Sequence, residues 1–177
     1  MLKLSNFVAI SLLASALPAA MGASAAQAAV LGPDAAACAP GASGAAVLVK
    51  VDGFKARTGD LRVQIYGSNP DDFLAKGRRV KRIDLPVTPR AESMEVCVAL
   101  PQPGNYAVAV RHDVEGDGKS GRGDGGGFSR NPGLSLFSLK PKYDDVVISV
   151  GAEPRRVNVV LNYVQGLSIK PVKSAAR

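Results

Sequence analysis

The feature of this chain that most constrains its fold is a series of short segments in which apolar, often β-branched, residues recur at every second position. Val47, Val49 and Val51 alternate with Leu48 and Lys50, and this period of two places one set of side chains on one face of a β-strand. Turn-forming residues separate the segments, and almost no helical periodicity is found. The sequence predicts strands over residues 45–51, 61–66, 79–86, 93–100, 106–112, 146–150 and 156–163. Seven such strands favour an all-β, antiparallel, seven-stranded β-sandwich of the immunoglobulin-like kind.

The first 28 residues have the pattern of a secretory signal peptide. Lys3 is their only charge, an apolar run covers residues 7–17, and small residues end in Ala26-Gln27-Ala28. This order of a basic start, an apolar run and an A-x-A motif predicts cleavage after Ala28. The alternative is a membrane anchor, but the apolar run is shorter than the roughly 20 residues that a spanning helix needs. We therefore expect a periplasmic or secreted protein with no transmembrane segment in the mature chain.

The domain organisation follows from composition. Residues 1–28 are interpreted as the signal peptide, residues 29–44 as a flexible Ala, Gly and Pro-rich lead-in, residues 45–166 as the β-sandwich domain, and residues 167–177 as a basic tail. A chain of this length suits one domain with a real core. We expect a monomer that meets an envelope glycan or a protein partner, and an exported protein of this kind is not expected to bind nucleic acid.

Cys38 and Cys97 are the two cysteines of the chain. In an exported protein an even number of cysteines predicts a disulfide rather than a catalytic thiol. Two alternatives stay open at this point, a buried free thiol and a mobile Cys38 that never meets Cys97.

A long loop rich in Gly and Asp begins at the end of the strand predicted over 106–112. Its acidic residues occupy the first, third, fifth and twelfth positions of a calcium-loop pattern, and they are Asp113, Glu115, Asp117 and Asp124. Gly118 takes the sixth position, where a sharp turn is needed, but Gly121 stands at the ninth and the twelfth lacks the usual bidentate Glu. The sequence predicts a structural Ca²⁺ site that orders the loop and fixes Phe128 and Asn131 for a partner. The alternative is a surface loop closed by Asx turns.

His112 is the only histidine of the chain and is adjacent to Asp113. One histidine can act as a general base, but no nucleophile or second transition-metal ligand stands in a recognisable pattern with it. A metal-dependent hydrolase is therefore the weakest of our hypotheses, and we expect a histidine at the end of a strand that is hydrogen-bonded locally. The run Gly125-Gly126-Gly127 has no strand–loop–helix context for phosphate binding, and we expect it to be flexible.

A basic run lies between residues 76 and 82. Its cationic members are Lys76, Arg78, Arg79, Lys81 and Arg82. Such a run attracts anionic glycan or lipid headgroups through non-specific charge. The alternative is structural, because Lys and Arg on an exposed strand prevent edge-to-edge pairing of sheets. No aromatic residue interleaves with the run, so stacking on nucleic-acid bases is not supported.

Three blocks of the sequence occur in an order that resembles a bacterial exported family catalogued as domain of unknown function 2141. They are residues 59–66 with 72–74, residues 103–113 running on to 116–119, and residues 127–131 with 143–145. The resemblance spans residues 45–163 and implies a periplasmic β-sandwich of the transthyretin-like kind, without implying an activity. The chain departs from the family pattern at Glu115 and Asp117, where the family usually carries Asn, and at Ser120-Gly121, where the family usually carries Leu-Asp.

We therefore expect a non-enzymatic binding or accessory module of the envelope.

Overall fold

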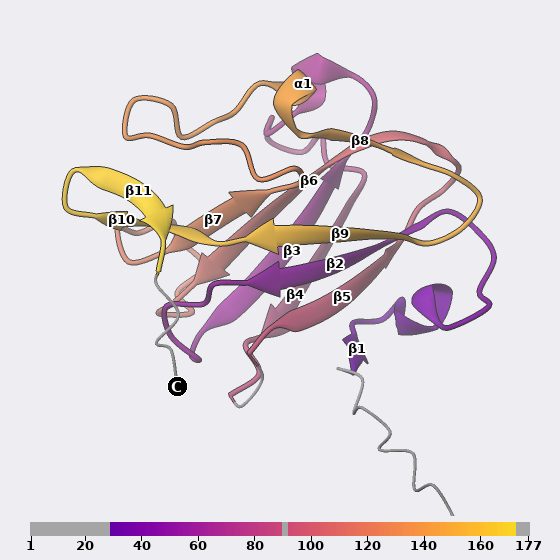
Figure 1. The fold of residues 1–177 in the computed structure, drawn as a ribbon, viewed down its shortest axis with the longest axis horizontal. Coiled ribbons are helices and arrows are strands. Elements are labelled where there is room, and N and C mark those ends of the chain that lie inside the picture. Colours follow the sequence, from indigo (N-terminus) through magenta and orange to yellow (C-terminus); the bar gives the residue numbers. More distant parts are fainter. Residues whose placement is uncertain (1–28, 90–91, 173–177) are drawn as a thin grey trace, which may run out of the picture.

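The computed structural model describes residues 29–89 and 92–172, which form two β-sheets packed face to face (Figure 1). The strands are β1 (Val30–Leu31), β2 (Ala46–Asp52), β3 (Asp60–Tyr66), β4 (Lys81–Pro86), β5 (Met94–Ala99), β6 (Gly104–Asp113), β7 (Gly125–Phe128), β8 (Val147–Val150), β9 (Arg155–Val160), β10 (Asn162–Gln165) and β11 (Ser168–Pro171). The helical elements are η1 (Ala35–Cys38), η2 (Pro70–Asp72) and α1 (Tyr143–Val146). The predicted β-sandwich is confirmed, with more strands than the seven expected.

The larger sheet has seven strands in antiparallel pairs, in the order β11-β10-β7-β6-β3-β4, with β8 also paired to β6. β6 is its longest strand and its centre. One side of β6 pairs with β3, while the other side pairs with β8 through residues 104–107 and with β7 through residues 109–112. The candidate loop, residues 114–124, connects β6 to β7 at the end of this central strand.

The smaller sheet has the order β1-β5-β2-β9 and includes two parallel pairs, β1 with β5 and β2 with β9. The sequence predicted antiparallel pairing throughout, and periodicity cannot distinguish the two because it reports which face a side chain occupies and not which strand lies alongside. The segment predicted as one strand over 156–163 instead serves both sheets. β9 pairs with β2, and after Leu161 the chain continues as β10 in the larger sheet.

The main core lies between the sheets and is made chiefly of aliphatic side chains, as expected for a chain without Trp. Val47, Val49 and Val51 of β2 all point into it. A second cluster covers the outer face of the larger sheet, where Tyr66, Ala107 and Phe128 pack beneath residues 73–74, which follow η2, and beneath Tyr143 of α1. Both faces of this sheet are therefore partly buried, which explains why its central strands read as nearly continuous apolar runs.

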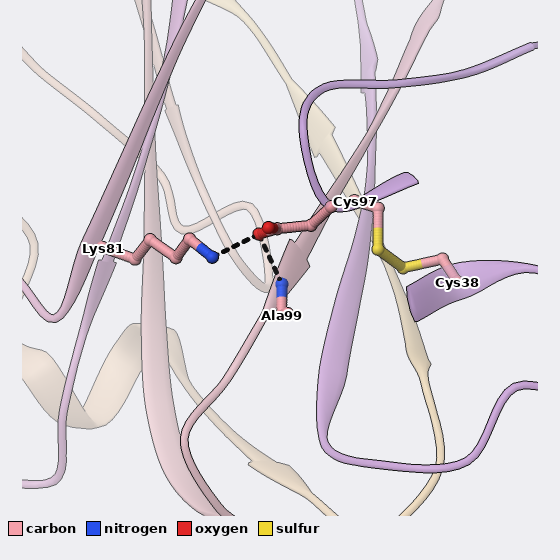
Figure 2. The surroundings of a disulfide bond; sticks show 5 residues. Cys38, Lys81, Cys97 and Ala99 are labelled. Atoms are coloured by element: carbon pink, nitrogen blue, oxygen red, sulfur yellow. Dashed lines mark hydrogen bonds and ion pairs between the residues drawn. A yellow bond between two sulfur atoms is a disulfide. The ribbon is translucent and has the colours of Figure 1, made fainter. Parts of the chain in front are cut away.

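Residues 30–38 are held to the smaller sheet at several points. β1 pairs with β5, and η1 packs on the outer face of the sheet through the Cys38–Cys97 disulfide, whose Cα atoms lie 5.9 Å apart. The Asp34 carboxylate accepts a hydrogen bond from the Ala99 amide at 2.9 Å and pairs with Lys81 Nζ at 2.5 Å (Figure 2). Since Lys81 belongs to β4 of the larger sheet, Asp34 links the two sheets.

Several segments differ from their expected form. Residues 29–44, predicted as a flexible lead-in, include β1 and η1, and the predicted tail includes β11, which pairs with β10 through residues 162–165. The Gly-rich run 125–127 is not a flexible loop but forms most of β7, with Gly125 and Gly127 buried. The predicted signal peptide, residues 1–28, lies outside the described residues. Among the residues that are described, no helix is long and apolar enough to cross a membrane.

Candidate functional site

The loop between β6 and β7 is organised around the Asp113 carboxylate. Asp113 Oδ1 accepts hydrogen bonds from the amides of Gly116 at 2.9 Å and Asp117 at 3.3 Å. Its Oδ2 accepts from the amide of Gly118 at 2.8 Å and from Arg111 Nη2 at 2.9 Å. A carboxylate has about four lone-pair sites, so these contacts satisfy Asp113 almost completely and close the first half of the loop around it.

Three of the four predicted cation ligands come together. Asp113, Glu115 and Asp124 each offer a carboxylate oxygen within 4.8 Å of the others. Asp124 also closes the loop, because it accepts hydrogen bonds from the Val114 amide at 3.2 Å and the Gly121 amide at 2.9 Å. Each Asp124 oxygen therefore retains a lone pair for a further contact.

The fourth predicted ligand, Asp117, lies outside this group. Its carboxylate accepts a hydrogen bond from the amide of Lys119 at 2.8 Å, which is an Asx turn. Glu115 instead folds toward the end of the loop, where a Cβ added to Gly123 would lie 2.6 Å from Glu115 Oε1. The glycine at position 123 therefore gives the Glu115 carboxylate its place beside Asp124.

The electrostatics of the loop keep Asp113 ionised. Burial alone would raise the pKa of the Asp113 carboxyl, but the hydrogen bonds from the loop amides and the charge of Arg111 together lower that pKa below its ordinary value. Asp60 lies directly opposite Asp113 on β3 and adds a further acidic group at this end of the two strands. Arg111 is the cation in contact with Asp113, so acidic groups outnumber basic ones here.

His112 points the opposite way, into the core. Its side chain is fully buried, with Nε2 2.9 Å from the Thr58 carbonyl oxygen and Nδ1 2.6 Å from the Tyr163 hydroxyl. A carbonyl can only accept, so Nε2 carries the proton and Nδ1 accepts from Tyr163. Burial lowers the pKa of His112, with the Thr58 carbonyl opposing this in part. His112 is hydrogen-bonded at the end of its strand, but the expectation of local partners is wrong, because both partners are more than 50 positions away in the sequence.

Successive residues of a strand face opposite sides of the sheet, and this separates His112 from the Asp113 carboxylate. The two side chains therefore do not meet at one centre. Thr58 and Tyr163 were not predicted as part of this region. The alternation of Val108, Val110 and His112 along β6 is the signal that could have placed the histidine on the core face.

The segment after the loop is structural. Phe128 is buried in the outer cluster of the larger sheet, so our expectation that it is held ready for a partner is wrong. The buried Ser129 hydroxyl accepts a hydrogen bond from the Val108 amide at 3.0 Å and donates one to the Val146 carbonyl at 2.5 Å. Asn131 binds the backbone of β9, donating to the Asn158 carbonyl and accepting from the Val160 amide. Residues 128–131 thus join β6, α1 and β9.

The basic run is spread along the edge of the larger sheet. β4, which carries Lys81 and Arg82, pairs with β3 only and is the edge strand. Lys81 pairs with Asp34, and Arg82 Nε lies 2.5 Å from Asp84 Oδ2. Arg78 Nε lies 3.5 Å from Asp72 Oδ1. Three of the five cations therefore have acidic partners, which agrees with the structural interpretation of the run.

One of three comparisons with known proteins identifies the family of this chain. Neither the curated proteins nor the solved structures include a match to the chain. A family model described as an uncharacterized protein conserved in bacteria matches residues 49–158, which run from β2 into β9 and include the loop, β7 and the segment after it. The chain therefore belongs to the bacterial family called domain of unknown function 2141.

Proposed function

We propose that this protein is a non-enzymatic binding or accessory module of the bacterial envelope, in which the loop from Asp113 to Asp124 binds a structural Ca²⁺ ion. The observation that carries the proposal is the group of three carboxylates, from both ends of the loop, whose oxygens lie within 4.8 Å of one another. Like charges at this distance repel, and a divalent cation among them turns that repulsion into attraction.

The three carboxylates take different parts in this site. Asp113 is occupied by four hydrogen bonds, so it contributes mainly its negative charge. Glu115 is exposed, and Asp124 keeps free lone pairs, so these two supply the direct ligands. Water and backbone carbonyl groups of the glycine-rich loop complete the six to eight oxygens that Ca²⁺ usually takes. The flexible geometry favours Ca²⁺ over Mg²⁺, which needs a near-ideal octahedron.

The role of the ion is conformational. The loop connects β6 to β7, and the ligands from its two ends draw these ends together. An ordered loop then presents its exposed residues, such as Lys119 and Arg122, in one arrangement to a protein or glycan partner.

Calorimetric titration of the purified protein with CaCl₂ tests the site. We expect binding with Kd of roughly 0.1–1 mM, as for extracellular calcium modules, together with an increase in Tm. Glu115→Gln and Asp124→Asn should each weaken binding, while Asp117→Asn, whose carboxylate lies outside the group, should leave it nearly unchanged. No heat and no thermal shift at millimolar Ca²⁺ would refute the proposal, and so would an equal loss in the Asp117 variant.

The other two hypotheses have less support. Binding of anionic glycan or lipid through residues 76–82 is weakened by the ion pairs of Arg78, Lys81 and Arg82. A hydrolase centred on His112 and Asp113 is weakened by the opposite directions of the two side chains.

A further inference from the structure

The hairpin between β7 and α1 exposes a concentration of apolar side chains. Six large apolar side chains are exposed among the described residues, and three of them, Leu136, Phe137 and Leu139, fall within four consecutive positions. The Phe137 side chain is fully exposed, at 102% of its reference area. Single exposed apolar residues need no explanation, but such a concentration marks an interaction site.

The tip of this hairpin is a closed turn rather than a frayed loop. The Ser135 amide donates to the Ser138 carbonyl at 3.2 Å, and the Ser138 amide donates to the Ser135 carbonyl at 3.0 Å. Leu136 and Phe137 stand between these two serines. They belong to the segment that connects β7 to α1, and this segment extends away from the two sheets (Figure 1). Pairing of the backbone groups lowers the cost of placing the turn in an apolar medium.

The base of the hairpin is anchored in the fold. Leu134 packs against the outer cluster of the larger sheet, and the Asn131 side chain is bound to the backbone of β9. On the returning side Tyr143 packs against the same cluster. The fold therefore holds the stem of the hairpin and leaves its apolar tip in water.

All charged side chains from residue 130 to residue 142 are cationic, and the next acidic residues, Asp144 and Asp145, lie in α1 at the base of the hairpin. Arg130, Lys140 and Lys142 are exposed, and no acidic residue occurs between residues 130 and 142. An apolar tip bordered by cations matches the boundary of an anionic bilayer, where apolar groups enter the acyl region and cations meet the headgroups.

We propose that the hairpin of residues 134–142 is a membrane-insertion tip that binds the protein to a bilayer surface containing anionic lipid. A protein partner fits less well, because a standard protein interface buries roughly 800 Å² on each side, and a projecting turn of four residues supplies only part of this area. A bilayer requires no complementary shape. The inference does not depend on the calcium proposal, since none of its residues belongs to the loop from Asp113 to Asp124.

A tryptophan reporter tests the insertion directly. The chain has no Trp, so Phe137→Trp places a single fluorophore at the tip. We expect its emission to shift to the blue with vesicles of phosphatidylethanolamine and phosphatidylglycerol, and to be quenched by lipids brominated on their acyl chains. An emission spectrum that does not change with these vesicles would overturn the proposal.

Co-sedimentation with the same vesicles tests the residues. The double variant Leu136→Ser, Phe137→Ser should weaken partitioning roughly tenfold or more, because two large apolar side chains no longer enter the bilayer. Lys140→Gln with Lys142→Gln should weaken it on anionic vesicles, and higher salt should do the same. Val80→Ser, which changes an exposed valine elsewhere, should have no effect. All variants are compared in the same form of the chain, so any effect of the apolar N-terminal segment is common to them.

Three results would contradict the proposal. The first is a wild-type protein that binds neither these vesicles nor phosphatidylcholine vesicles, which would leave a protein partner as the occupant of the tip. The second is full binding by the serine double variant. The third is loss of vesicle binding only on neutralising Lys76 and Arg79, which would assign it to the basic run. Because the substituted residues are exposed, an unchanged Tm shows that each variant is folded.

Discussion

The Nδ1 atom of His112 lies 2.6 Å from the hydroxyl oxygen of Tyr163, although the two residues are 51 positions apart. The contact joins the end of β6 to β10, two strands separated in the larger sheet by β7. The Tyr163 oxygen also accepts a hydrogen bond from the Lys55 amide at 3.2 Å, and Phe54 packs edge-on against the imidazole at a centroid distance of 5.2 Å. The histidine therefore lies at one end of the sandwich as a neutral group with both ring nitrogens hydrogen-bonded.

Stability should fall as the pH drops below about 6.5, the usual pKa of an exposed histidine. The folded protein holds the pKa of His112 below that of the unfolded chain. The unfolded state therefore binds a proton first, and acidification favours it by up to about 1.4 kcal/mol per pH unit until the folded-state pKa is reached. Urea denaturation at several pH values between neutral and mildly acidic measures this slope.

His112→Gln provides the control for that slope. His112 is the only histidine, so the variant should be less stable overall but almost independent of pH in the same window. A wild-type slope that survives in the variant would assign the effect to another group. Asp113 affects stability in a separate pH range. The folded protein lowers the pKa of its carboxyl, so the stability that the ionised group contributes is lost only as the pH falls below about 3.9.

Tyr163→Phe should destabilise the protein by about 1–3 kcal/mol, because it leaves the buried Nδ1 of His112 without a donor. Tyr106→Phe is a matched comparison. Its hydroxyl donates to the Gln102 carbonyl at 2.8 Å, a group at an exposed turn that water can reach, so we expect a smaller loss. Free energies of unfolding from urea titration measure both. Equal losses in the two variants would contradict the special role of the His112 contact.

The strands and the partners of His112 differ in how far the sequence could reveal them. The alternation in β2, β3 and β6 predicted strands within one or two residues of the observed bounds, because each has one face against the main core. The family blocks were also informative, since the family model matches residues 49–158, which contain all of them. The faces of strands were therefore predictable, while the partners of His112 were not, because pairing over long range leaves no local pattern.

β7 was missed for a different reason. Its sequence, Gly125 to Phe128, has almost no side chains with which to form an alternating pattern. The glycines are required by neighbours far along the chain, since a Cβ on Gly125 would lie 2.4 Å from the Tyr163 ring. The separation of Asp117 from the other predicted ligands was hidden likewise, because spacing alone does not show which carboxylates turn back to bind their own backbone.

Gly127→Ala should destabilise the domain by about 1–3 kcal/mol through overpacking. The added Cβ would lie 2.7 Å from the Val160 carbonyl oxygen, which belongs to the backbone and cannot rotate away. Gly151→Ala is the control, since nothing lies within 4 Å of the position of its Cβ and its φ is not positive. Thermal unfolding of both variants measures the difference, and an unchanged Tm for Gly127→Ala would show that β7 and β9 can move apart at low cost.

Removal of the disulfide should lower the free energy of unfolding by about 4 kcal/mol on the chain-entropy account, because Cys38 and Cys97 close a loop over a sequence separation of 59 residues. Cys38→Ser with Cys97→Ser tests this by urea denaturation. We expect the variant to retain its fold, since the Asp34 contacts to Ala99 and Lys81 remain. A variant as stable as the wild type under oxidising conditions would refute the prediction.

Export should be accompanied by cleavage after Ala28. The predicted site leaves a single residue before β1, which begins at Val30. Mass spectrometry of the protein recovered from the periplasm or medium of a bacterial host should give a chain starting at Ala29. Recovery of the chain with residues 1–28 still attached, or its retention in the cytoplasm, would contradict the signal-peptide prediction.

The parallel pairing of β2 with β9 sets the order in which the domain can be assembled. β2 and β5 precede residues 155–160 by more than 50 positions, so in a chain that emerges from its N-terminus one edge of β2 has no partner until β9 follows. Such distant pairings slow folding, and a bare apolar edge favours aggregation. Cys38 and Cys97 both precede β9. In an oxidising compartment their disulfide can therefore form, and hold η1 to β5, before β9 pairs with β2. A chain truncated before β9 would therefore leave one edge of β2 and part of the main core exposed to water, even with the disulfide formed.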